Sequence, residues 1–300
     1  MPADPTRYTS ADEDSSRWVG FPFRRGDIVI SARSKTGTTW VQMICALLIF
    51  QTSALPDSLS AMSPWLDWLI TPRGDVYDQL AAQAHRRFIK SHTPLDGLPV
   101  DPEVTYIVTG RHPLDMAVSL YHQGENLNRE RIAELTAQPD PGPVANHRSP
   151  LHQWLLEWIE SDASPKESLD SLRGVMWHLV DAWQRRDRQD VVLVHYEDLV
   201  ADLNREMRRL ADRLGITVPE SKWPALVDAA TFAQMRARAE SIIPDPAGIL
   251  KDPRAFFRRG SSGAGAEALT RVELEHYYLR ASQLAPPDLF EWLHFGSATM

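Results

Sequence analysis

The segment over residues 28–40, Ile-Val-Ile-Ser-Ala-Arg-Ser-Lys-Thr-Gly-Thr-Thr-Trp, carries residue types that bind phosphate groups. Its β-branched start predicts a buried strand, and a turn around Gly37 leads into a helix that begins at Thr38 or Thr39. At such a junction, free backbone N–H groups and the helix dipole attract an anion, which Lys35 and nearby hydroxyls can help to hold. The lysine precedes the glycine, so the Walker pattern Gly-x-x-x-x-Gly-Lys-Ser/Thr is absent. An ordinary strand–helix turn with a solvated lysine is the alternative.

A second segment brings a lysine and a histidine to the end of an apolar strand. The strand is predicted over 87–90, and alternation puts Lys90 and His92 on the same side of an extended chain. Ligands of open α/β sheets bind where the strands end. Imidazole titrates near neutral pH, so His92 is a candidate general base. The alternative for any single histidine among ten is a surface or capping role.

A third segment combines an arginine and a serine that suit a phosphate group. A strand predicted over 105–109 is followed by Arg111, and Pro113 stands where the first residue of a helix is expected. Ser119 follows about two turns into that helix. Arginine binds phosphate in bidentate fashion through its planar fork. Asp115 suits the positive end of the helix, so we expect it to be structural.

These segments lie between amphipathic stretches that predict helices. The predicted strands are 28–31, 87–90, 105–109 and 191–195, and the predicted helices include 38–51, 113–123, 177–186 and 199–214. Strands that alternate with helices imply a parallel sheet covered on both faces. We therefore expect a single α/β domain over 19–300, with a central parallel sheet flanked by helices, after a flexible polar arm over 1–18. The proline-rich stretches 136–150 and 243–265 are predicted to be long loops, of the kind that form lids or disordered segments.

Composition argues against several classes of protein. A net charge of −8 disfavours a nucleic-acid-binding protein, so an anionic ligand needs a local basic pocket. The single cysteine, Cys45, cannot form an internal disulfide or a cysteine-rich zinc site. No secretory signal is visible, and the longest apolar run, 44–50, is too short to span a bilayer. We expect a cytoplasmic protein without a metal or a transmembrane segment.

In chain order, these segments resemble those of the cytosolic-type sulfotransferases, which use 3′-phosphoadenosine 5′-phosphosulfate (PAPS) as the donor. The 5′-phosphosulfate loop of that family usually reads Pro-Lys-Ser-Gly-Thr-Thr-Trp, and here Ser34 replaces the proline and Thr36 the serine. The other matching segments are Lys90 to Pro94, Arg111 to Ser119, Tyr196-Glu197-Asp198, Thr231-Phe232 with Met235, and Arg258-Arg259-Gly260. The runs Ser-Pro-Trp-Leu and Ser-Gln-Leu-Ala-Pro-Pro-Asp-Leu also look like those of mycobacterial glycolipid sulfotransferases.

The resemblance implies transfer of a sulfuryl group from PAPS to a hydroxyl of a lipid, glycolipid or aromatic acceptor, without a metal, and with adenosine 3′,5′-bisphosphate as the product. It implies that His92 is the general base, that Lys35 holds the bridging oxygen and that Lys90 adds positive charge. The cofactor-binding residues that it implies are Lys35, Thr36, Gly37, Thr38, Thr39, Trp40, Arg111, Ser119, Tyr196, Thr231, Phe232, Arg258, Arg259 and Gly260. Candidates for an acceptor pocket, each of which suits a packed core equally, are Trp65, Leu66, Trp68, Leu69, Tyr121, Trp177 and Phe256.

Two other functions stay open. A nucleotide kinase or other phosphoryl transferase shares the phosphate cradle, and Asp198 after the fourth strand is its candidate magnesium ligand. A non-catalytic PAPS-binding relative is the second, because Ala264 and Gly265 stand where the family has Asp-Trp, which suggests a looser lid or lower activity. The identity of the acceptor and the oligomeric state do not follow from the sequence.

Overall fold

A parallel sheet forms the centre of the molecule. The computed structural model describes residues 4–136, 149–245 and 247–297. Its sheet has four strands in the order β2-β1-β3-β4, and each neighbouring pair is parallel. The strands are β1 (Ile28–Ser31), β2 (Phe88–Ser91), β3 (Thr105–Gly110) and β4 (Val191–His195). The predicted α/β fold with a central parallel sheet is confirmed.

Side chains along the strands alternate between two apolar cores, one on each face of the sheet. On β1, Val29 belongs to one core, whereas Ile28 and Ile30 belong to the other. Tyr106 and Ile107 on β3 divide in the same way. Helices must therefore cover both faces.

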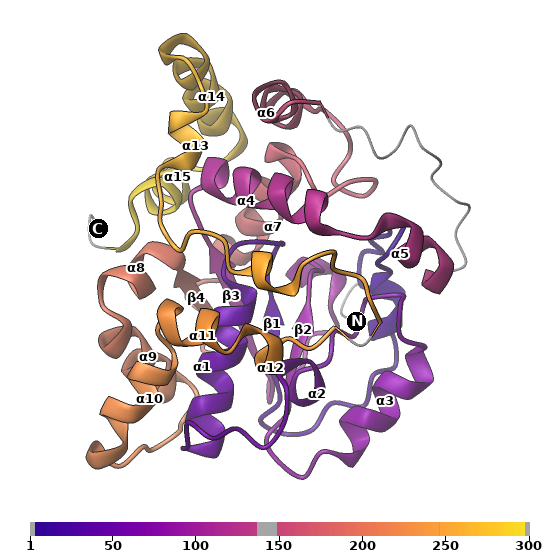
Figure 1. Cartoon of the computed structure of the whole chain (residues 1–300), viewed down its shortest axis with the longest axis vertical. Helices are drawn as coiled ribbons and strands as arrows, with labels where there is room; N and C mark the ends of the chain where they lie inside the picture. The colour runs from indigo at the N-terminus through magenta and orange to yellow at the C-terminus, as the bar shows by residue number, and fades with distance from the viewer. Residues whose placement is uncertain (1–3, 137–148, 246, 298–300) are drawn as a thin grey trace.

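The helices form two layers, with α1 and α7 on opposite faces of the sheet (Figure 1). The layer with α7 contains α4 (Pro113–Asn126), α6 (Leu151–Glu160), α7 (Leu172–Gln184), α13 (Ala264–Glu267), α14 (Arg271–Leu284) and α15 (Pro287–Phe295). The layer with α1 contains α1 (Thr38–Phe50), α8 (Tyr196–Ala201), α9 (Leu203–Arg213), α10 (Trp223–Ala229), α11 (Phe232–Ala237) and α12 (Ala239–Ile242). Further helices are α2 (Leu59–Met62), α3 (Arg73–Ala82) and α5 (Arg129–Thr136), and the 3₁₀ turns include η1 (Ser15–Trp18), η2 (Leu95–Gly97), η4 (Glu220–Lys222) and η5 (Pro253–Phe256). Nowhere in the described ranges does a helix combine the length and the hydropathy that crossing a membrane requires.

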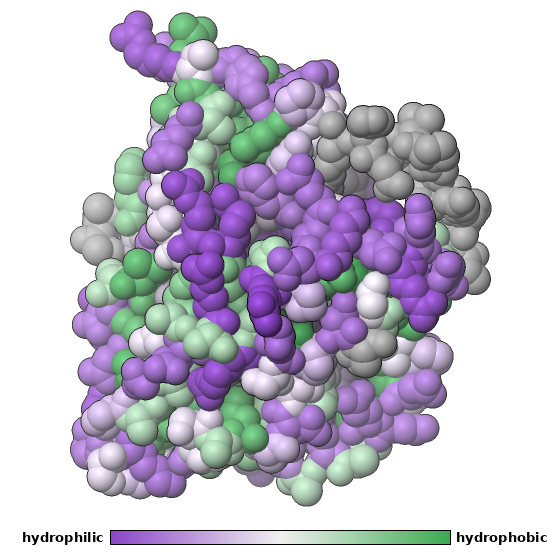
Figure 2. Space-filling model, in the orientation of Figure 1, coloured by the Kyte–Doolittle hydropathy of each residue, from purple (hydrophilic) through white to green (hydrophobic). Residues whose placement is uncertain are grey.

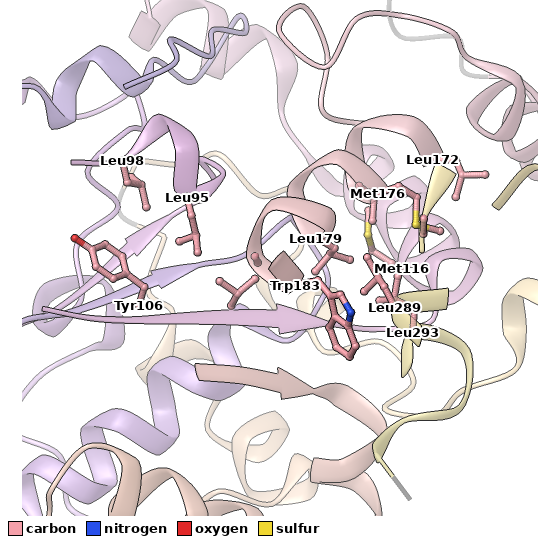
Figure 3. Packing of buried hydrophobic residues seen from close by; sticks show 14 of the residues in the cluster. Leu95, Leu98, Tyr106, Met116, Leu172, Met176, Leu179, Trp183, Leu289 and Leu293 are labelled. Atoms are coloured by element: carbon pink, nitrogen blue, oxygen red, sulfur yellow. The ribbon is translucent and has the colours of Figure 1, made fainter. Parts of the chain in front are cut away.

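The core under α7 fixes the sheet from one side. Figure 3 shows Leu179 and Trp183 of α7, together with Leu289 and Leu293 of α15, beside β3. The Trp183 indole N–H also donates to Asp288 at 2.9 Å. This packing gives the loops at the carboxyl ends of the strands a rigid support.

The N-terminal arm, predicted to be flexible over 1–18, contacts the domain through several buried side chains among its described residues, from residue 4 on. Trp18 is fully buried and Tyr8 is 4% exposed. The Tyr8 hydroxyl donates to Asp96, and Arg17 donates to two backbone carbonyls. The polar composition suggested a flexible arm. The sequence does not reveal these contacts, because the partners lie far away along the chain.

The long loop predicted over 243–265 crosses the face of the molecule between α12 and α13 (Figure 1). It contains η5, and hydrogen bonds of 2.8 Å anchor it to the backbone and side chain of Asn126, the last residue of α4. The loop predicted over 136–150 falls mainly on residues 137–148, which lie outside the described residues.

Candidate active site

The loop between β1 and α1 forms an open anion cradle. Lys35 and Gly37 both have left-handed backbone conformations, with φ values of 70° and 108°. Gly37 is the N-cap of α1 and supplies no side-chain cap, so the first N–H groups of the helix are left for a ligand. The buried Thr38 hydroxyl has no partner in the described part of the chain. Both features suit a bound phosphate or sulfate group.

The Thr36 side chain does not face this cradle. Its hydroxyl donates to the Arg33 carbonyl at 2.7 Å and lies 2.5 Å from the Thr109 hydroxyl on β3. Thr36 is absent from the cavity wall, while Thr39 and Trp40 line it. The Thr36 side chain therefore fixes the loop, and binding of the donor by Thr36 stays a prediction.

Arg111 and Tyr196 form the next part of the wall. The Arg111 guanidinium donates to the Lys35 carbonyl at 3.2 Å and lies 4.1 Å from the centre of the Tyr196 ring. Its Nε is buried without a partner among the described residues. Ser119, on α4, lines the same cavity. The spacing predicted from the sequence thus brings Arg111, Ser119 and Tyr196 to one site.

The segment after η5 adds a second arginine. Arg258 lines the cavity and has no ion-pair partner within the described ranges, and burial together with Arg259 and Arg111 lowers its pKa. Gly260 has a φ of 65°, and a Cβ at this position would lie 2.6 Å from the Phe232 ring. Phe232, Arg259 and Gly260 also line the cavity.

Thr231 is the second predicted cofactor residue that the structure places elsewhere. Its hydroxyl caps α11, where it accepts from the Gln234 N–H, and it donates to the Asp228 carbonyl at 2.8 Å. Thr231 does not line the cavity. Its role in the structure is to position Phe232, the first residue of α11.

Asp115 fastens the segment after Gly260 to the start of α4. Its two carboxylate oxygens accept from the N–H groups of Gly263 and Gly265, each at 2.8 Å. A Cβ at Gly265 would collide with Leu114, so this close approach requires glycine. Ala264 and Gly265, which depart from the family pattern, therefore form the start of α13, which packs against the start of α4. The hydrogen bonds of Asp115 agree with the structural role predicted for it.

His92 is buried with one nitrogen committed. Its Nδ1 lies within hydrogen-bond distance of the Ala32 carbonyl, which can only accept, so Nδ1 carries the proton and donates. Burial, followed by the charges of Lys90 and Arg33, holds the pKa of His92 well below its usual value. The imidazole is therefore neutral near pH 7, and Nε2 keeps its lone pair. His92 lines the cavity, where this lone pair can accept a proton.

Two lysines in the cavity have lowered pKa values. Burial and the charges of Arg111, Lys90 and Arg258 lower the pKa of Lys35 to about 7. Burial lowers the pKa of Lys90 to about 8, although acidic neighbours oppose the change. The Lys35 ammonium lies 3.3 Å from the Gln123 side-chain oxygen, and the Lys90 ammonium lies 3.5 Å from the Trp65 ring centre. A bound anion would favour the charged form of both lysines.

One cavity of about 640 Å³ joins the anion cradle to His92. Of the acceptor-pocket candidates, Trp65, Trp68 and Phe256 line it. The others, which do not line this cavity, are Leu66, Leu69, Tyr121 and Trp177. On the face shown in Figure 2, strongly hydrophilic residues gather near the centre, where the chain between α12 and α13 crosses in Figure 1.

Among the cavity residues that sequence reasoning missed, three have charged or polar contacts of interest. Gln123 contacts Lys35, and Glu13 and Arg33 line the wall near His92. An arginine inside a strand–helix loop is a signal that could have pointed to Arg33, whereas nothing local marks Glu13. Asp198, the candidate magnesium ligand, accepts from the Ser297 N–H at 3.0 Å and does not line the cavity.

Comparison with known proteins places these features in a family context. A family model described as "Sulfotransferase domain" matches residues 25–278. The chain is 41% identical over 308 residues to a glycolipid sulfotransferase of Mycobacterium bovis, covering 96% of this chain and 94% of the relative. It is 25% identical over 260 residues to sulfotransferase 1A1 of Rattus norvegicus, covering 84% of this chain and 81% of the relative.

Solved structures share the fold. Retinol dehydratase in complex with androsterone and the inactive cofactor PAP matches with a TM-score of 0.70 and 19% identity, over 91% of this chain and 84% of the other. Mouse sulfotransferase SULT7A1 complexed with PAP matches with a TM-score of 0.65 and 18% identity, over 93% and 91% of the two chains.

Proposed function

Because this chain belongs to the sulfotransferase family and is an enzyme that transfers a sulfuryl group from PAPS, we propose that its acceptor is a hydroxyl of a glycolipid or similar lipid and that His92 is the general base. One observation carries the proposal. The His92 ring is neutral, its Nδ1 donates to the Ala32 carbonyl, and its Nε2 keeps a lone pair within the cavity that contains the anion cradle. The location in the cytoplasm stays a prediction, and the oligomeric state stays open.

The part of the cavity around Lys35, Arg111 and Arg258, here called the donor half, fits PAPS, and the part around His92 and Trp65 is the acceptor half. The buried Thr38 hydroxyl and the Arg111 Nε lack partners among the described residues, as expected of groups that wait for an anion. The N-terminus of α1 with Lys35 would hold the 5′-phosphosulfate, and Arg111 with Arg258 would hold the 3′-phosphate. The rings of Tyr196 and the other aromatic residues of this wall, Trp40 and Phe232, would hold the adenine.

The transfer needs one proton acceptor and one positive charge. His92 Nε2 would take the proton of the acceptor hydroxyl as its oxygen bonds to sulfur. The bond between sulfur and the bridging oxygen breaks, and its electron pair stays on the phosphate of the leaving bisphosphate. Lys35 would stabilise that charge as it develops, and Lys90 would add positive potential near the transferred group.

The acceptor half supports a lipid-like molecule. Trp65, Trp68 and Phe256 supply aromatic surface, and Leu127, Ile132 and Leu250 line the same cavity. The relative from Mycobacterium bovis, which aligns over nearly the whole chain, is named for a glycolipid acceptor. The alternative is a purely aromatic acceptor, which would suit Trp65 and Trp68 but would not use the aliphatic lining residues.

An acceptor panel tests the proposal. Purified enzyme with PAPS labelled in the sulfuryl group should transfer the label to an alkyl glycoside or glycolipid more efficiently than to a simple phenol. Melting temperature should rise more with adenosine 3′,5′-bisphosphate than with ATP and magnesium. Binding of the bisphosphate without transfer to any acceptor would contradict the proposal and favour a non-catalytic relative, whereas preference for ATP and magnesium would favour a phosphoryl transferase.

A further inference from the structure

The N-terminal arm supplies part of the cavity wall, although it lies outside the residues that the family model matches. The arm pairs with the segment 67–69. Glu13 forms an antiparallel bridge with Trp68, and the Leu69 N–H donates to the Asp12 carbonyl at 2.9 Å. This pairing fixes the backbone of Glu13 beside the aromatic part of the wall.

Contacts connect Glu13 to His92 along two routes. On one route, the Trp65 ring lies 4.4 Å from the His92 ring, and Trp68 stacks on Trp65 at 4.6 Å with an angle of 16° between the rings. Trp68 then pairs with Glu13. The aromatic pair therefore links the His92 ring to the backbone of the segment that holds Glu13.

The other route runs through Arg33, whose side chain is 3% exposed. Its Nη1 donates to the His92 carbonyl at 2.8 Å and lies 3.7 Å from a carboxylate oxygen of Glu13. Its Nη2 donates to Asp170 at 2.5 Å. Arg33 thus holds Glu13 and the backbone of His92 in a fixed relation at the same end of the cavity.

The Glu13 carboxyl group is available to a ligand. Its side chain is 21% exposed and lines the cavity, and no hydrogen bond to its carboxylate is made by the described residues. Burial raises the pKa of Glu13 to about 8, against the opposing charge of Arg33. Near neutral pH the group can therefore donate as well as accept a hydrogen bond, which suits a hydroxyl as its partner.

We propose that Glu13 binds a second hydroxyl of the acceptor, at the same end of the cavity as His92, so that the enzyme selects sugar-like polyols over monohydric alcohols. This inference rests on the proposed function and specifies the acceptor headgroup. The Trp65–Trp68 pair offers ring surface to the C–H groups of a sugar. A phenol or a simple alcohol leaves the Glu13 carboxyl without a hydrogen-bond partner, which costs binding. Lys90 and Arg33 on the same wall disfavour a cationic headgroup.

The test uses two acceptors with the same tail, octyl β-glucoside and 1-octanol. The measured quantity is the ratio of kcat/KM for the glucoside to kcat/KM for octanol. In Glu13→Ala this ratio should fall about 10- to 100-fold, the effect of one lost hydrogen bond to a buried polar group. Glu13→Gln should restore most of it, because an amide donates and accepts. Asp4→Ala, which removes an exposed carboxylate from the same arm, should leave the ratio unchanged.

Binding separates this inference from the proposed function. Calorimetry of octyl glucoside with the adenosine 3′,5′-bisphosphate complex should show weaker binding in Glu13→Ala than in the wild type. If Glu13→Ala binds octyl glucoside more weakly but the wild type transfers no sulfuryl group, the role of Glu13 in binding is supported and the proposed function is contradicted. An unchanged ratio, or equal losses with both acceptors in a variant that melts like the wild type, would overturn the role of Glu13. If Glu13→Ala does not fold, Glu13→Met, of similar volume, gives the same readout.

Discussion

In the donor half of the cavity, Lys35 and Arg258 have no ion-pair partner among the described residues, whereas in the acceptor half Arg33 pairs with carboxylates of the protein. Arg258 has no ion-pair partner among the described residues, and Lys35 is surrounded by other positive charges. In the acceptor half, Arg33 is held by Asp170 at 2.5 Å and lies 3.7 Å from Glu13. One half is thus prepared for an anion, and the other for a neutral molecule with hydroxyl groups.

The difference also concerns how each half is built. The donor half uses compact motifs at the ends of β1 and β3, to which Tyr196 after β4, Phe232 of α11 and Arg258 after η5 are added. The acceptor half combines the N-terminal arm, the segment before α3 and the end of β2. The phosphate-binding motifs of the donor half can therefore be recognised locally in the sequence, while the acceptor half depends on contacts between distant segments.

The largest loss in the donor half should follow removal of Lys35. Because its charge matters most where the leaving group becomes negative, Lys35→Ala should lower kcat about 10²- to 10³-fold. Affinity for adenosine 3′,5′-bisphosphate should change much less. Steady-state turnover at saturating PAPS and calorimetry with the product measure the two quantities. Lys222→Ala, an exposed lysine on η4, is the control, and near-normal kcat in Lys35→Ala would contradict the role of Lys35.

The two arginines should act on binding in a selective way. Arg111→Ala and Arg258→Ala should each weaken adenosine 3′,5′-bisphosphate about 10- to 100-fold, because a charge-assisted contact is lost. Binding of 5′-AMP, which lacks the 3′-phosphate, should change far less. Arg254→Ala is a matched control, since Arg254 lies in the same segment but pairs with Glu240 outside the cavity. Equal losses for both nucleotides would show that these arginines do not contact the 3′-phosphate.

A smaller effect should appear in the protons exchanged on binding. The pKa values of Lys35, about 7, and Lys90, about 8, are lowered by burial, so the lysines are partly neutral at pH 8. A bound anion favours their charged forms, so adenosine 3′,5′-bisphosphate should bind with uptake of protons at pH 8 and with less uptake at pH 6. Calorimetry in buffers of different ionisation enthalpy measures this number. Proton release at pH 8 would mean that the cavity does not hold the lysines as described.

Much of the fold and of the donor half could be predicted because the signals are local. The strands Ile28–Ser31 and Val191–His195 match the predicted limits, since apolar runs end at polar residues. The helix predicted over 199–214 is instead α8 followed by α9, and the break lies at Asp202, whose side chain caps α9. That capping signal was present in the sequence but is weaker than the helical periodicity around it.

What the sequence did not predict concerns side-chain direction and distant partners. Thr36 fits the phosphate loop by type, but its direction depends on the left-handed backbone at Lys35, which the sequence does not reveal. Glu13 reaches the cavity only because the arm pairs with the segment around Trp68. Residues that act through such contacts leave no local pattern in a single sequence.

The account depends most directly on His92 as the base that links the two halves. Single turnover on a preformed complex with PAPS should be about 10²- to 10⁴-fold slower in His92→Ala than in the wild type, with PAPS affinity within a few-fold. His276→Ala, on the exposed part of α14, should behave like the wild type. A His92→Ala enzyme that melts like the wild type and transfers the sulfuryl group at a similar rate would contradict the central claim.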